Sequence, residues 1–203
     1  MKQRFKRLNL KIIQIIVSII LKDVSVAYNS LHCPEWYQLD IMKLIIGTFQ
    51  DYTTDIRKNI NPISFEQYIV ELEAKSLLLY WQSFKNKNAI YKMQNAPPKL
   101  KSDHDRNISF FAQFKNLQQT TSTFEDIENI IKLITSDRRT LIIELYSLIK
   151  HYPEVPLAFF EAVISKKDDL SKEFIIDIMN ECKKKENNEI KPTISSYFKS
   201  FFY

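Results

Sequence analysis

Glycine is almost absent from this chain, since Gly47 is the only one among 203 residues. Glycine provides positive φ angles and lets a backbone approach a phosphate group closely. Dinucleotide-binding fingerprints, Walker loops, kinase-type glycine-rich loops and nucleophile elbows all need glycines at fixed spacings, so the sequence excludes these sites. Hairpins of the Asn-Gly or Asp-Gly kind are missing as well. We therefore expect a helical protein that is not an enzyme.

Cysteine is also scarce, and the two residues of this type, Cys33 and Cys182, lie far apart in the sequence. Neither belongs to a Cys-x-x-Cys pair or to a Cys/His cluster with the spacing of metal ligands. The sequence therefore predicts no disulfide framework, no metal site and no cofactor, which suits a reducing compartment.

Long apolar runs are missing, and the longest candidate extends from Ile12 to Leu21 between two lysines. A transmembrane helix needs about 20 apolar residues, so this run is too short to cross a membrane. Its spacing of three and four predicts a buried helical face instead. That predicted face consists of Ile12, Ile15, Ile16, Ile19 and Ile20, with Gln14, Ser18, Lys22 and Ser25 on the opposite side.

The sequence is rich in apolar residues and has an excess of basic residues over acidic ones. The chain is 45% hydrophobic and 13% aromatic, which is sufficient for a folded core, and its net charge is +5. Basic residues gather within the first eleven positions and again at Lys183, Lys184 and Lys185. These three lysines are a candidate interaction surface for an acidic protein or an acidic membrane. Aromatic residues are not interleaved with them, so we expect no nucleic-acid partner.

Helical spacing and helix-breaking residues predict the arrangement of the first half of the chain. One helix is expected from Glu35 to Lys58, with Gly47 placed where a neighbouring helix approaches closely. Ser64 and Gln67 match a capping box for a long third helix that extends to about Met93. Pro97 and Pro98 are expected to end that helix, and residues 99–105 to form a polar loop.

The second half predicts shorter helices. Their expected ranges are near 108–114, 123–134, 137–149, 155–164 and 169–182. The clearest apolar stripe among them consists of Leu141, Ile142, Leu145, Leu148 and Ile149. The fold class predicted for residues 1–203 is thus all-α, built as elongated antiparallel bundles of seven to nine helices, with a sub-boundary near residues 96–104.

Candidate chemistry is confined to two short groups. Asp103, His104 and Asp105 form the densest titratable cluster, and a helical metal-dependent enzyme built around His104 is the rival hypothesis. Adjacent side chains point in different directions, however, so we interpret this cluster as a solvated loop or a helix cap. The His32 and Cys33 pair resembles a base and a nucleophile, but catalytic partners seldom adjoin in sequence.

Three segments resemble one protein family. Residues 45–56 carry an apolar pair, then Thr, an amide residue, Asp-Tyr and a further Asp; residues 69–87 hold a Val-Glu-containing helix that continues to Lys87. Residues 141–155 hold a helix that ends in His-Tyr-Pro-Glu. Together, in order and spacing, they resemble the Sec-six subunit family, exocyst complex component three, over residues 31–182 of this chain.

This resemblance implies a function and a set of partners. The exocyst is a complex of helical, rod-shaped subunits that tethers secretory vesicles to the plasma membrane before SNARE-mediated fusion. The chain would then correspond to the carboxyl-terminal helical bundles of a non-enzymatic subunit. Implied partners are other exocyst subunits, SNARE or SNARE-regulating proteins and an acidic membrane surface. The implied location is cytoplasmic, peripheral at plasma-membrane sites of secretion. A generic helical scaffold is the alternative.

Overall fold

The computed structural model describes residues 2–114 and 123–186 of the chain. Within them the backbone forms nine α-helices and one short 3-10 helix, η1, and its only extended pairing is an isolated bridge between Tyr91 and Lys167. The prediction of an all-α fold with seven to nine helices is therefore confirmed. The helices are α1 (Lys2–Asp23), α2 (Ser25–Ser30), η1 (Pro34–Tyr37), α3 (Ile41–Asn59), α4 (Pro62–Ser83), α5 (Ala96–Ala112), α6 (Thr123–Thr135), α7 (Leu141–His151), α8 (Leu157–Ile164) and α9 (Lys172–Glu186).

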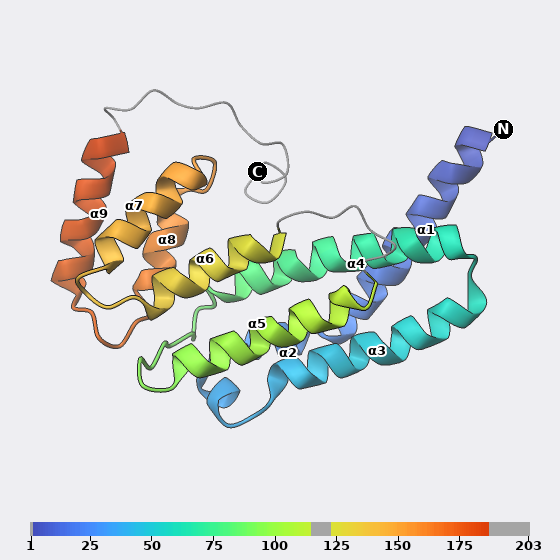
Figure 1. The fold of residues 1–203 in the computed structure, drawn as a ribbon, viewed down its shortest axis with the longest axis horizontal. Helices are drawn as coiled ribbons and strands as arrows, with labels where there is room; N and C mark the ends of the chain where they lie inside the picture. Colours follow the sequence, from blue (N-terminus) through green and yellow to red (C-terminus); the bar gives the residue numbers. More distant parts are fainter. Residues whose placement is uncertain (1, 115–122, 187–203) are drawn as a thin grey trace.

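The molecule is elongated, with its longest helices aligned along its length (Figure 1). Helix α4 runs antiparallel to α3, and α5 runs antiparallel to α4. Helix α1 crosses behind α4, and α6 packs against α5. Helices α7, α8 and α9 gather at one end, while the first turns of α1 project from the other (Figure 1). One continuous set of buried apolar residues connects these helices from Ile13 in α1 to Cys182 in α9.

The first part of the chain differs from the predicted helix over residues 35–58. Pro34 begins only η1, and α3 starts at Ile41 after Asp40, whose carboxylate accepts a hydrogen bond from the backbone N–H of Lys43. Gly47 lies within α3, but a Cβ added there would have no neighbouring atom within 4 Å. The expected close approach of another helix at Gly47 is therefore wrong.

Helix α4 begins with a different cap from the one predicted. The side chain of Asn61 accepts the N–H of Ser64 at 2.9 Å, and Pro62 occupies the first turn, where a missing N–H costs nothing. Ser64 is buried, and its hydroxyl donates to Asn9 at 3.2 Å instead of capping a helix. The predicted capping box of Ser64 and Gln67 is thus wrong, although the break before this helix is correctly placed.

Helix α4 also ends ten residues before the predicted limit at Met93, at Ser83. The following segment is held by pairing with distant backbone: the Asn86 amide donates to the carbonyls of Tyr28 and Leu31, and the N–H of Tyr91 donates to the carbonyl of Lys166 at 2.8 Å. These long-range bonds compensate for the lost helical bonds, and helix propensity alone does not reveal them.

Residues 99–105 belong to α5 and do not form a loop. Pro97 and Pro98 lie in the first turn of this helix, the position where proline is tolerated, so they start a helix here and do not end one. The sub-boundary suggested near residues 96–104 falls inside α5. In the second half, the stripe predicted on α7 faces the core. Its residues Leu141, Leu145 and Leu148 are buried, and Ile142 and Ile149 are partly buried against the core.

Candidate interaction surfaces and buried polar sites

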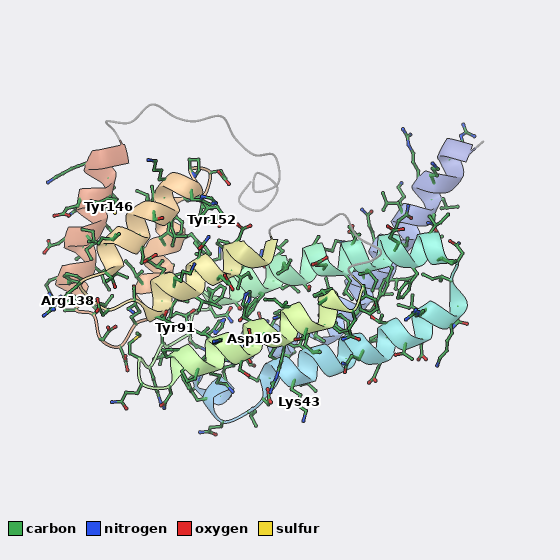
Figure 2. All side chains as sticks on the ribbon, in the orientation of Figure 1. Lys43, Tyr91, Asp105, Arg138, Tyr146 and Tyr152 are labelled. Atoms are coloured by element: carbon green, nitrogen blue, oxygen red, sulfur yellow. The ribbon has the colours of Figure 1, made fainter. Side chains whose placement is uncertain are left out.

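The acidic and histidine cluster on α5 is divided between the core and the surface. Asp103 is 1% exposed and accepts a hydrogen bond from the indole Nε1 of Trp36 at 2.6 Å. Burial raises the pKa of Asp103 to about 6, against this bond and the nearby positive charges of Lys99 and Arg106, which lower it. Asp105 lies exposed on the same helix (Figure 2).

His104 points toward α6, where its Nε2 lies 3.9 Å from a carboxylate oxygen of Glu128. The ring is 3% exposed, and burial lowers the pKa of His104 despite the neighbouring carboxylates of Glu128 and Asp105, which raise it. The interpretation of 103–105 as a solvated loop is therefore wrong for Asp103 and His104, because α5 turns both into the core. The expected divergence of the three side chains is correct.

A metal-dependent site around His104 has no ligand set among the residues described. Over residues 2–114 and 123–186, no group of three or more His, Cys, Asp or Glu residues lies close enough to hold a metal ion. Asp103 faces Trp36 while His104 faces Glu128, so the two side chains do not converge. The geometry gives the enzyme hypothesis no support at this position.

His32 occupies a buried aromatic site that the sequence did not predict. Its φ is 66°, in the left-handed region that only glycine adopts without cost, and its ring stacks on Phe84 with centroids 4.8 Å apart. The ring Nε2 lies 3.1 Å from the hydroxyl of Ser83, and the carbonyl of His32 accepts the N–H of Ile90. Burial lowers the pKa of His32 to about 3, so the imidazole stays neutral at physiological pH.

Cys33 does not have the environment of a catalytic nucleophile. Its Sγ lies 3.5 Å from the carbonyl of Asn29, and burial together with the carboxylate of Glu35 raises the pKa of the thiol, against a smaller opposing effect of Lys166. A nucleophilic cysteine needs a lowered pKa. The neighbouring His32 packs its ring on Phe84 and against Ser83, so it belongs to the core.

Lys167 is a second buried polar residue that sequence patterns did not reveal. Its ammonium group donates to the backbone carbonyls of Ile134 and Ser136, at the end of α6, and lies 3.7 Å from a carboxylate oxygen of Asp169. Burial lowers the pKa of Lys167, while the nearby carboxylates raise it. The backbone of Lys167 pairs with Tyr91 in the isolated bridge, while its side chain binds the carboxyl end of α6. Lys167 therefore connects these two parts of the chain.

The predicted basic surface lies at the end of α9. Lys183 and Lys184 are exposed there, while the side chain of Lys185 lies outside the described residues. The aromatic residues near the carboxyl terminus also lie outside the described part. No ligand or partner chain in the structure tests this surface, so its role stays a prediction.

The apolar face of α1 differs from the predicted one. The residues that α1 buries are Ile13, Val17, Ile20 and Leu21, whereas Ile12, Ile15 and Ile19 are exposed. The prediction placed Ile12, Ile15 and Ile19 in the core because the isoleucines of α1 occur on more than one face of the helix. Only Ile20 and the partly buried Ile16 fulfil it.

No helix among the described residues is both long and apolar enough to cross a membrane. This finding agrees with the short apolar run of α1, which Gln14 and Ser18 interrupt and which ends at Lys22.

The comparisons with known proteins identify one family. The family model described as exocyst complex component Sec6 matches residues 1–172. The exocyst complex component sec6 of Schizosaccharomyces pombe is 36% identical over 169 residues, which cover 81% of this chain and 22% of that protein.

A solved structure has the same fold. The crystal structure of the C-terminal domain of the exocyst subunit Sec6p superposes with a TM-score of 0.63 at 14% identity, covering 92% of this chain and 50% of that chain. The chain therefore spans about a fifth of the S. pombe relative and half of the solved domain. Since the family model covers most of its length, the chain belongs to the exocyst complex component Sec6 family.

Proposed function

We propose that this protein acts as a non-catalytic, helical part of an exocyst subunit, which tethers secretory vesicles to the plasma membrane before SNARE-mediated fusion. The observation that carries the proposal is the match of the Sec6 family model over residues 1–172. The elongated helical fold supports it, because aligned helices provide both reach and wide exposed faces for protein partners (Figure 1).

The partners we propose are other exocyst subunits, together with SNARE or SNARE-regulating proteins. An acidic membrane surface is a further proposed partner, which would place the protein in the cytoplasm, peripheral to the plasma membrane. The exposed lysines at the end of α9 supply positive charge, which would attract an acidic protein surface or an acidic membrane. We propose no catalytic residue.

Co-purification from cell extract tests this function. The tagged 203-residue chain should recover other exocyst subunits from cytosol of cells that contain the complex. Recovery of no exocyst subunit, with the chain folded as judged by its helical circular dichroism, would contradict the proposal and favour a generic helical scaffold.

Charge reversal of the α9 lysines tests the surface separately. Lys183→Glu, Lys184→Glu and Lys185→Glu, made together, should weaken partner recovery and leave the helical circular dichroism unchanged. The matched control reverses three exposed lysines elsewhere on the molecule, Lys43, Lys87 and Lys101; Lys43 is seen on α3 in Figure 2. Equal recovery with both triple variants would remove this surface from the proposal but not the exocyst assignment.

A further inference from the structure

Helix α1 presents a row of aliphatic side chains that nothing in the described structure covers. The row consists of Leu8, Ile12, Ile15 and Ile19, with exposed fractions of 54%, 48%, 60% and 53%. The spacings between these residues are four, three and four, as at the a and d positions of a heptad, so the side chains line up along one stripe. Ile13 and Val17 face the bundle instead and are buried. The row is therefore a second apolar face of α1, directed away from the core.

Positive charge borders this row on one side. From Lys2 to Lys22 the sequence of α1 contains six lysine or arginine residues and no acidic residue. The helical period places Arg4, Lys11 and Lys22 along one margin of the row. The first acidic side chain, Asp23, is engaged, because the hydroxyl of Tyr52 donates to it at 2.5 Å. The surface is thus an aliphatic stripe with a basic edge.

A hollow of about 230 Å³ adjoins the row between α1, α3 and α4. Its apolar lining includes Ile12, Ile16, Ile56 and Ile60. The polar side chains around it bond to one another: Asn9 donates to Gln67 and accepts from Ser64, Asn61 accepts the N–H of Ser64, and Tyr68 bonds Thr53. Because these polar groups have partners within the fold, the hollow suits an apolar side chain.

We propose that this face of α1 binds an amphipathic helix from another protein, one with a heptad row of Leu or Ile and acidic residues beside it. One aliphatic residue of that helix would enter the hollow next to Ile12, and its carboxylates would face Arg4, Lys11 and Lys22. The inference rests on the proposed function, in which the partners are helical subunits, and it adds the chemistry of the helix they must present.

The charge pattern favours such a partner over a second copy of this chain. Two copies of α1 packed antiparallel through this row would bring their basic edges together, and like charges at flanking positions disfavour pairing. In a parallel pair each basic edge would face a margin that carries no acidic residue, so neither arrangement gives the charge complementarity that an acidic helix gives. A membrane surface fits less well, because the row is narrow and α1 contains no Trp or Tyr to anchor it at an interface.

The direct test uses a synthetic peptide of four heptads, with Ile and Leu at its a and d positions and Glu at its e and g positions. We expect it to bind the full 203-residue chain in a fluorescence anisotropy titration, and Ile15→Glu to weaken that binding at least tenfold. Ile176→Glu is the matched control, because Ile176 is 55% exposed on α9, at the opposite end of the molecule. It should change the affinity less than twofold. Both sites are exposed, so circular dichroism should show both variants folded.

A charge swap tests the basic edge. Lys11→Glu with Lys22→Glu should weaken binding of the glutamate peptide at least tenfold, and a peptide with Lys at its e and g positions should then bind the variant more tightly than it binds the unmodified chain. Equal affinity of both peptides for the unmodified chain would overturn the proposed charge complementarity.

Other occupants give different results. A dimer of the unmodified chain in analytical ultracentrifugation that Ile15→Glu dissociates would assign the row to a second copy. Vesicle binding that needs phosphatidylserine and is lost in Ile15→Glu, without peptide binding, would assign it to a membrane. Either result overturns the proposal. If exocyst subunits co-purify equally with the unmodified chain and with Ile15→Glu, and the peptide does not bind, the inference fails while the proposed function stands.

Discussion

Trp36 and Asp103, which are 67 positions apart in the sequence, meet in the core through a 2.6 Å hydrogen bond from the indole Nε1 to a carboxylate oxygen. Both residues are at most 1% exposed. This bond joins η1 to α5 and satisfies the indole donor, which a buried tryptophan needs. It also places a carboxylate in an apolar region, with a consequence for the pH dependence of stability.

Asp103→Asn should stabilise the protein more at pH 7 than at pH 4.5, relative to the unmodified chain. The pKa of Asp103 is about 6 in the fold and 3.8 as the ordinary value, so the stabilisation that a bound proton gives is full below about 3.8 and is lost as pH rises through 6. Asparagine keeps an acceptor for Trp36 without the charge. The stability difference between the two proteins should therefore shift by about 2 kcal/mol between the two pH values.

Urea unfolding at both pH values measures this difference. Asp105→Asn, which changes an exposed carboxylate two positions further on, is the control and should alter the free energy of unfolding by less than about 0.5 kcal/mol. A stability difference for Asp103→Asn that is the same at pH 7 and pH 4.5 would show that burial does not penalise the charge.

Gly47→Ala should stabilise the protein by about 0.5 to 1 kcal/mol. Gly47 lies in the interior of α3, where alanine has the higher helix propensity, and a Cβ at this position would meet no atom within 4 Å. Thermal unfolding measures the effect. The reverse change at a half-buried site in α4, Ala74→Gly, should destabilise by a similar amount. A loss of stability in Gly47→Ala would mean that a neighbouring group needs the space.

Leu145→Ala should destabilise the protein by about 2 to 5 kcal/mol, since Leu145 is 0% exposed on α7 and its loss leaves a cavity. Ile143 lies two positions before it on the same helix and is 65% exposed. Ile143→Ala is therefore the matched control and should change stability by less than about 0.5 kcal/mol. Similar effects of the two changes, measured by chemical denaturation, would show that the buried face of α7 is wrongly assigned.

The stripe on α7 illustrates what the sequence was able to predict. Leu141, Leu145 and Leu148 recur at intervals of four and three residues, so the buried face of α7 could be assigned from spacing, although the exposed Ile143 lies between them. Isoleucines of α1 occur on several sides of the helix, and spacing did not distinguish Ile13 from Ile15. Which of them is buried depends on where α4 packs, a tertiary contact that the local pattern does not contain.

The buried polar residues were beyond prediction for a related reason. Asp103 and His104 follow two prolines and several polar residues, a composition typical of a loop, yet the prolines occupy the first turn of α5 and the helix turns both side chains inward. Their partners, Trp36 and Glu128, are distant in the sequence. The resemblance to the Sec6 family, by contrast, rested on three segments in order, and the family model confirms it.

Lys167→Met should destabilise the protein by about 2 to 4 kcal/mol, because the change leaves the carbonyls of Ile134 and Ser136 without their shared donor. The lowered pKa of Lys167 shows that burial disfavours the ammonium charge, and this works in the opposite direction, since methionine needs no hydration. We expect the carbonyls to decide the sign, because two buried acceptors lose their donor while one cation is removed. Lys166→Met, which removes only a half-buried donor to the carbonyl of Lys87, is the control and should cost less than about 1 kcal/mol. Equal or greater stability of Lys167→Met in urea unfolding would show that desolvation of the ammonium outweighs its hydrogen bonds at the end of α6.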